Sequence, residues 1–232
     1  MTLDRILAIL GIILGLPGFL LLLVPGYRAE AILSLGLGLT LISAPISINW
    51  FLRKPPYTIT SAKVTLSFLD NAIRQARLTK DYTIRPNQRY LTVLTFRNIA
   101  ADGSIHSLRW NGQPIDPGWI REILGEYEVT IHFPGPHQLW REFSGSLSYE
   151  ATDAFNGREE GLVYAPDHPT KTATITVEFP ASRPCRGTRA YRVEGAGQVP
   201  ISAPSVLAKG LRFETTLKRP RPGTEYWFWW DW

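Results

Sequence analysis

The sequence predicts a membrane α-helical hairpin followed by an all-β domain, an antiparallel β-barrel or β-sandwich of about eight to ten strands. Three observations support this class. Residues 6–27 and residues 31–52 carry no charged side chain. The rest of the chain alternates apolar and polar residues with period two, as half-buried strands do. Turn pairs such as Asn111-Gly112 separate these runs. We therefore expect two domains, residues 1–54 and residues 55–232.

The two uncharged stretches are each 22 residues long, and roughly 20 apolar residues span the bilayer core as a helix. A polar turn with Arg28 and Glu30 joins them, which predicts a hairpin in the lipid bilayer. A signal peptide is the alternative, since Ala29-Glu30-Ala31 resembles a cleavage site. Against cleavage, the first stretch is longer than the apolar region of most signal peptides, and a second apolar stretch follows at once.

The basic residues beside the two stretches predict the orientation. Arg5 precedes the first stretch, Arg53 and Lys54 follow the second, and Arg28 alone lies in the turn. Because Lys and Arg favour the cytoplasmic side, we expect both termini in the cytoplasm. Arg53 and Lys54 are expected among anionic lipid headgroups.

Small residues recur in both stretches at the spacing that lets helices approach closely in lipid. Gly11 and Gly15 form a G-x-x-x-G pair, and Ser34 and Gly38 form a similar pair. These residues are expected to pack either within the hairpin or between protomers of a homo-oligomer. No charge interrupts either stretch, which argues against a transporter or proton relay.

Residues 55–232 show the β alternation most clearly in five runs. These are residues 63–68, 90–96, 127–133, 173–179 and 211–217. One helical turn is expected within residues 117–125. This part carries 21 Lys and Arg against 18 Asp and Glu, so its charge is too small for a binder of duplex nucleic acid.

No catalytic constellation is evident. The sequence has no G-x-S-x-G elbow and no phosphate-binding loop, and its single cysteine, Cys185, has no recognisable histidine partner. The histidines lack the spacing of metal ligands; they are His106, His132, His137 and His168. We expect a protein that is not an enzyme and that has no metal site and no cofactor.

One candidate ligand site is a run of arginines that recur every third residue. It contains Arg183, Arg186, Arg189, Tyr191 and Arg192. On a polyproline-like segment, which has three residues per turn, the arginines would share a face. Guanidinium groups grip phosphate and an aromatic ring stacks on a base, so the run predicts a nucleotide-type ligand. A solvated loop edge, or a patch that touches anionic lipid, is the alternative.

The last residues of the chain form a strongly aromatic segment. Residues 226–232 contain four of the eight tryptophans. Such a strand is expected in the core between two layers. A protein interface and a membrane-interface belt are the alternatives.

In architecture, a short membrane hairpin followed by a β-rich domain resembles the two-transmembrane, β-strand-rich effectors of bacterial cyclic-oligonucleotide antiphage systems. The resemblance implies a protein of the bacterial inner membrane whose cytosolic β-domain senses a cyclic nucleotide. Self-association would then let the helices damage the membrane. The arginine run is a candidate taken from the residues of this chain, not from the family. The rival hypothesis is a membrane-tethered interaction module without a small ligand, which docks a partner through the terminal aromatic residues or through an exposed edge strand.

Overall fold

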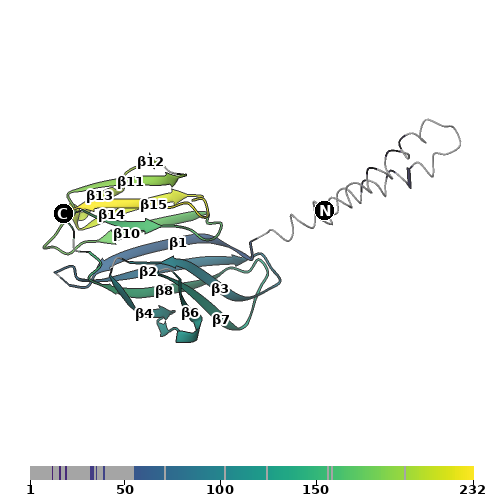
Figure 1. The fold of residues 1–232 in the computed structure, drawn as a ribbon, viewed down its shortest axis with the longest axis horizontal. Helices are drawn as coiled ribbons and strands as arrows, with labels where there is room; N and C mark the ends of the chain where they lie inside the picture. The colour runs from purple at the N-terminus through teal and green to yellow at the C-terminus, as the bar shows by residue number, and fades with distance from the viewer. Residues whose placement is uncertain are drawn as a thin grey trace. The chain divides into compact units, whose positions relative to one another are not determined.

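The computed structural model describes residues 55–232, except positions 71, 102, 124, 156, 158 and 196, and seven single residues of the first 54 (Figure 1). Those seven residues are all helical; they are Ile12, Leu16, Phe19, Ile32, Leu33, Leu35 and Leu39. The chain divides into two compact units, Met1–Lys54 and Pro55–Trp232.

The structure corrects the predicted fold class. Within the residues that it describes, no helix is long and apolar enough to cross a membrane. Within the described part of residues 55–232, the helices are two short 3-10 turns, η1 (Pro117–Trp119) and η2 (Ala208–Gly210). A membrane α-helical hairpin plus an all-β domain is therefore wrong as a fold class, and the structure supports an all-β class. The same finding contradicts the predicted multi-pass location in the bacterial inner membrane with both termini in the cytoplasm.

Several predictions fall on the first 54 residues. Apart from the seven single positions, the expected spans 6–27 and 31–52 lie outside the described residues. The same is true of the predicted helix-packing and headgroup residues, which are Gly11, Gly15, Ser34, Gly38, Arg53 and Lys54.

The described residues form strands β1 to β15. Their bounds are β1 Tyr57–Phe68, β2 Gln75–Pro86, β3 Tyr90–Ile99, β4 Ser104–Trp110, β5 Gln113–Pro114, β6 Ile120–Ile123, β7 Glu126–Gln138, β8 Phe143–Thr152, β9 Glu159–Tyr164, β10 Thr172–Glu178, β11 Gly187–Glu194, β12 Gly197–Pro200, β13 Ser205–Leu207, β14 Arg212–Lys218 and β15 Tyr226–Asp231. The strand count exceeds the predicted eight to ten because short strands such as β5 and β13 carry too few residues to show a periodic pattern.

The strands form three sheets. The largest has eight strands in the order β13-β14-β10-β1-β2-β8-β4-β5, and the two smaller sheets are β12-β11-β15-β9 and β3-β7-β6. Most neighbouring strands are antiparallel, as the sequence predicts, but β1 and β10 pair in parallel. A pattern of alternation shows which residues share a face, yet it does not show which strands become neighbours.

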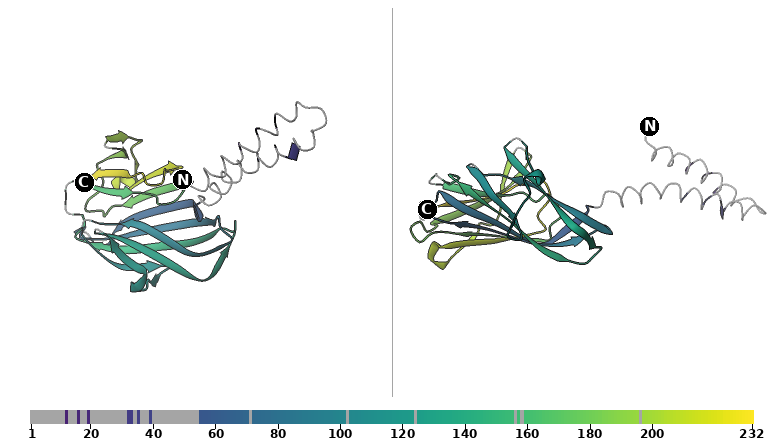
Figure 2. Two further views of the ribbon diagram at one scale, coloured as in Figure 1. Left: turned by 45° about the vertical axis from the view of Figure 1, so that its right-hand side comes forward. Right: turned by 90° about the horizontal axis from the view of Figure 1, so that it is seen from below.

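Both smaller sheets lie on the same face of the large sheet. Tyr82 of the large sheet stacks on Phe96 of β3 with ring centroids 5.0 Å apart, and Phe213 of the large sheet contacts Trp230 of β15 at 5.7 Å. One hydrophobic core contains all four side chains. The result is a β-sandwich, and its two layers are visible in Figure 2.

Candidate functional site

A cleft of about 680 Å³ opens beside β3. Six of its lining residues lie on this strand, between Tyr90 and Arg97. The facing wall contains the first residue of β1, Tyr57, and the loop residues Asp167 and His168. We call this feature the β3 cleft.

The cleft exists because β3 is an edge strand. It pairs with β7 alone in its sheet, which leaves its second edge facing the cleft. The Thr95 carbonyl oxygen on this edge accepts hydrogen bonds from the Tyr57 hydroxyl at 3.0 Å and from His168 Nε2 at 3.3 Å. The backbone N–H of Arg97 donates to Asp167 Oδ2 at 2.7 Å. Side chains thus cover the edge at one end of the cleft, which is one way to protect an exposed strand.

Backbone contacts hold the loop that carries Asp167 and His168. The N–H of Ile59 donates to the Pro169 carbonyl oxygen at 2.9 Å, and the N–H of Lys171 donates to the Ile59 carbonyl oxygen at 2.9 Å. The N–H of Gly223 donates to Pro166 at 2.9 Å. The two bonds of Ile59 attach the loop to β1, so the facing wall of the cleft is held by the large sheet.

Tyr57 and His168 of the facing wall favour their neutral forms. Burial raises the pKa of Tyr57, and burial lowers the pKa of His168. The two rings lie 4.2 Å apart between centroids. A neutral imidazole whose Nε2–H donates to Thr95 fits this geometry, since a carbonyl can only accept. Tyr57 and His168 therefore offer positioned hydrogen bonds rather than charge, and Arg97 is paired with Glu128 at 2.7 Å.

Exposed aromatic residues lie at the start of β3. Tyr90 is 63% exposed and Trp140 is 64% exposed, and the register pairs Tyr90 with Gln138, close in sequence to Trp140. Guanidinium groups lie over both rings, Arg89 over Tyr90 at 5.5 Å and Arg85 over Trp140 at 5.9 Å. Aromatic residues and arginines are the side chains most enriched where proteins bind each other.

The structure does not bring the predicted arginine run together. The segment from Gly187 is the strand β11 and not a polyproline-like helix. Successive side chains of a strand alternate between faces, so Arg189 and Arg192 point to opposite sides.

Each arginine has separate surroundings. Arg183 lies over the Trp232 ring at 5.8 Å, Arg186 is exposed, Arg189 pairs with Glu159, and Arg192 pairs with Glu194 at 2.8 Å. Tyr191 is half-buried on the face of Arg189. A common phosphate-binding face is absent from this part of the structure, and binding of a nucleotide-type ligand there stays a prediction.

The terminal aromatic strand is divided between two environments. Tyr226, Phe228 and Trp230 of β15 are buried in the core. Trp227 and Trp229 lie half-buried on the opposite face, with ring centroids 5.7 Å apart. The strand is thus core on one face only.

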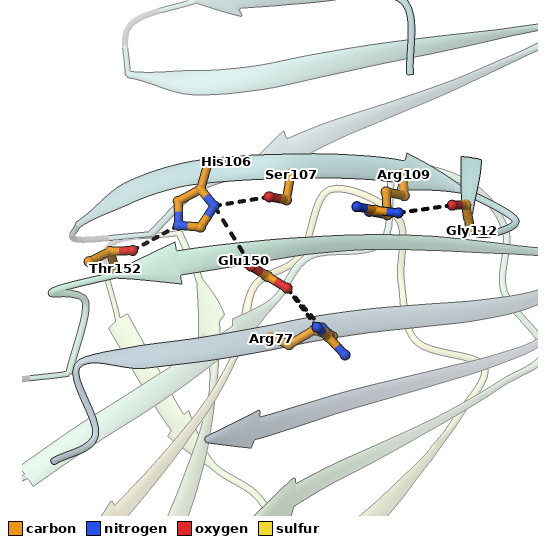
Figure 3. A network of polar contacts seen from close by, with 7 residues as sticks. All are labelled: Arg77, His106, Ser107, Arg109, Gly112, Glu150 and Thr152. Atoms are coloured by element: carbon orange, nitrogen blue, oxygen red, sulfur yellow. Dashed lines mark hydrogen bonds and ion pairs between the residues drawn. The ribbon is translucent and has the colours of Figure 1, made fainter. Parts of the chain in front are cut away.

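A second polar group lies on the large sheet, across β2, β4 and β8 (Figure 3). His106 contacts Thr152 Oγ1 at 2.8 Å and Ser107 Oγ at 3.1 Å, while Glu150 lies 3.8 Å from His106 and 2.7 Å from Arg77. The Glu150 carboxylate thus lies closer to Arg77 than to His106. The His106 side chain is 46% exposed. These groups form a surface network of hydrogen bonds and ion pairs.

Two of the histidines line a different hollow. His132 and His137 border an aromatic pocket of about 500 Å³ together with Trp110, Trp119 and Phe143. Within the described residues, no group of three His, Cys, Asp or Glu side chains could hold a metal ion.

Sequence reasoning missed the β3 cleft. Tyr57, Thr95 and the adjacent pair Asp167 and His168 are far apart in the chain and share no motif. The available signal was the alternation of residues 90–96, which predicted the strand without showing that one of its edges has no neighbour.

Comparison with known proteins assigns no family. No protein-family model matches the sequence, and no curated protein matches it. The M1 zinc metallopeptidase of Deinococcus radiodurans aligns with 75% of this chain and 42% of its own at 14% identity and a TM-score of 0.38. Yeast LTA4 hydrolase aligns with 75% of this chain and 29% of its own at 12% identity and a TM-score of 0.42. A putative protease of Parabacteroides distasonis aligns with 77% of this chain and with 41% of its own chain, at 9% identity and a TM-score of 0.41.

The chain spans less than half the length of these structures. At such TM-scores the likeness carries no argument about fold or activity.

Proposed function

We propose that residues 55–232 form a non-catalytic protein-interaction domain that binds an extended segment of a partner protein in the β3 cleft. The observation that supports this function is the edge of β3, which has no neighbouring strand and which lines the cleft with residues between Tyr90 and Arg97. An extended peptide adds to such an edge through main-chain hydrogen bonds, and pockets for alternate side chains supply specificity.

The open end of the edge is the part that a partner can use. Val93 and Thr95 lie two residues apart in the uninterrupted stretch 93–96 of the β3–β7 register. The N–H and C=O of Val93 therefore point to the cleft, as the C=O of Thr95 does. Tyr57, His168 and Asp167 cover the edge from Thr95 onward. A bound strand therefore pairs at and before Val93, next to the exposed Tyr90.

The chemistry of the partner follows from the same end of the cleft. Arg85 and Arg89 lie over the exposed rings of Trp140 and Tyr90. An extended segment with acidic side chains complements these cations and the aromatic surface beneath them.

The test compares Val93→Pro with Val93→Thr in the full chain. Proline removes the Val93 N–H, which points to the open part of the cleft, and is tolerated in edge strands. Threonine keeps both the N–H and the β-branched shape. Peptides are first selected on the wild-type chain from a random displayed library, and their Kd values are then measured by fluorescence polarisation. We expect Val93→Thr to bind like wild type and Val93→Pro to lose about tenfold or more. Equal binding by both variants contradicts strand addition at this edge.

Sensing of a nucleotide-type signal is not supported by the placement of the arginine run. It stays a prediction that the same chain can test with a panel of cyclic dinucleotides and trinucleotides in thermal-shift measurements.

A further inference from the structure

The aromatic pocket opens between the large sheet and the smallest sheet. Residues of β4, β5 and β8, among them Trp110 and Phe143, border it on one side, and residues of η1 and β7, among them Trp119 and His132, border it on the other. Its volume of about 500 Å³ lies within the roughly 300–1,000 Å³ that small-molecule sites have. None of the described residues that line it also lines the β3 cleft, so the two features are separate.

The more buried side chains of the aromatic pocket are aliphatic and aromatic. Ile115 and Ile131 are 7% and 2% exposed, and Trp110 is half-buried. The Trp110 indole lies directly over Gly145, where an added Cβ would come within 2.2 Å of the ring, and it contacts Phe96 of the core at 5.6 Å between centroids. The inner part of the pocket is therefore an apolar surface held in place by the core.

Trp119 supplies an aromatic ring that a ligand can reach. Its residue is 36% exposed, and within the part of the chain that the structure describes its ring contact is with His132, at 5.0 Å and an interplanar angle of 52°. Hydrogen bonds fix the turn that carries it. Asp116 Oδ1 accepts the Gly118 N–H at 2.8 Å, and the Asp116 carbonyl accepts the Trp119 N–H at 2.9 Å. The indole is thus both accessible and carried on a fixed backbone.

Neutral polar side chains line the same pocket. Asn111, Gln113 and Ser144 are exposed there. Asn111 Oδ1 accepts the Ser146 N–H at 2.8 Å, and the Asn111 N–H donates to the Ser146 carbonyl at 2.8 Å. These bonds orient the amide and leave its Nδ2 group as a donor. Burial lowers the pKa of His137, so at neutral pH its imidazole is uncharged and has one donor and one acceptor nitrogen.

The chemistry of the lining limits the ligand. Among the described residues that line the pocket, none is Asp, Glu, Lys or Arg. A charged ligand would lose its hydration here without gaining an opposite charge. A purely apolar ligand would cover Asn111, Gln113 and Ser144 and leave their polar atoms without hydrogen bonds. The lining therefore suits a neutral ligand that has an apolar face and several hydroxyl groups.

The orientation of the rings separates a sugar from a planar aromatic ligand. A planar ligand is held best between two parallel rings, but the parallel pair of this pocket, His137 and Phe143, is already stacked at 3.7 Å and 11°. The ring of Trp119 is tilted from that of His132. A pyranose needs one ring only, because the partial positive charge of its C–H face is attracted to the negative face of an aromatic system. Its hydroxyls then lie around the edge, where they reach neutral polar side chains.

From these observations we propose that the aromatic pocket binds a neutral pyranose sugar. The C–H face of the sugar packs on the Trp119 indole, and its hydroxyls form hydrogen bonds with Asn111, Gln113 and Ser144. The proposal goes beyond peptide binding at the edge of β3 and is independent of it, because the two sites share no described lining residue. Either one can fail without the other.

The experiment uses the full chain and the methyl glycosides of glucose, galactose, mannose and N-acetylglucosamine as probes, with indole as the planar aromatic alternative. Saturation-transfer NMR detects binding at millimolar sugar, and titration of tryptophan fluorescence gives the Kd. Wild type is compared with Trp119→Ala. The matched control is Trp227→Ala, which removes a half-buried indole from the outer face of β15, outside the pocket. We expect at least one glycoside to bind wild type and Trp227→Ala, and Trp119→Ala to weaken that binding about tenfold or more.

Two further variants keep the test decisive. Trp119→Phe retains an aromatic face, so it should recover part of the binding that Trp119→Ala loses. Gln113→Ala removes an exposed amide from the pocket and should weaken binding severalfold, while thermal unfolding shows that each variant is folded. Three results overturn the proposal: no glycoside binds wild type, folded Trp119→Ala binds the sugar as wild type does, or indole binds while no glycoside does.

Discussion

The rings of Tyr57 and His168 lie 4.2 Å apart between centroids at an interplanar angle of 43°. Tyr57 begins β1 of the large sheet, and His168 lies in the loop before β10. Both side chains reach the Thr95 carbonyl on β3. This ring pair therefore connects the large sheet to the smallest sheet and forms the closed end of the β3 cleft.

Removal of the Tyr57 hydroxyl should weaken this connection. Tyr57→Phe keeps the buried ring and loses one hydrogen bond to Thr95, which corresponds to about 1 kcal/mol in the free energy of unfolding. Urea denaturation followed by fluorescence measures the change. Tyr90→Phe is the control, since Tyr90 is 63% exposed and its hydroxyl contributes little. A loss of equal size in the two variants would show that the Tyr57 bond has no special role.

The buried position of His168 should make stability depend on pH. Its pKa is lowered in the folded protein by burial, so the unfolded chain binds more protons between the ordinary value of 6.5 and the lower folded value. The free energy of unfolding should thus fall as the pH drops through this window.

His168→Gln should flatten this part of the pH dependence, because glutamine does not titrate. Thermal unfolding of both proteins between pH 7 and pH 5 (approximately the range over which histidine titrates) measures the difference. Thr95, Asp167 and Arg97 also act on the pKa of His168, and all three are retained in the variant. Parallel curves for wild type and variant would contradict the assignment.

The two faces of β15 should respond differently to truncation. Trp230 is 1% exposed and contacts Phe179 and Phe213, both at 5.7 Å, so Trp230→Ala leaves a cavity and should cost about 3–5 kcal/mol. Trp227→Ala, on the opposite face of the same strand, should cost about 1 kcal/mol or less. Chemical denaturation of both variants gives the comparison. Similar losses would mean that the outer face is covered as well.

Gly145 of β8 leaves room for an aromatic side chain. A Cβ atom at this position would lie 2.2 Å from Cζ2 and Cη2 of Trp110, so Gly145→Ala must displace the indole. We expect a loss of about 1–3 kcal/mol together with a shift in tryptophan fluorescence. Gly135→Ala is the matched control because no atom lies within 4 Å of its added Cβ, and it should leave both measurements near those of wild type.

Much of the β-domain could be predicted from alternation. All five predicted runs lie in strands, within β1, β3, β7, β10 and β14 in their main part, because burial of one sheet face imposes period two on the side chains. The predicted turn around Trp119 corresponds to η1. The fold class as a whole was wrong, since it rested on apolar stretches whose length and lack of charge do not by themselves establish membrane-spanning helices.

The candidate site could not be predicted in the same way. The arginine run was singled out for its spacing, but spacing has meaning only once the backbone conformation is known. In the strand β11 the run divides between two faces, and its members find separate partners such as Glu159 and Glu194.

By itself, the sequence determined where strands form and which side chains of each strand share a face, since both depend on neighbours along the chain. The tertiary structure decided which strands are adjacent and which edge stays open. Lys80 shows the difference most clearly, because its polar side chain becomes an interior group only through the register that places it between Val64 and Leu147. The edge of β3 opens into a cleft for the same reason: hydrogen bonds between distant segments, rather than local pattern, set the order of strands in a sheet.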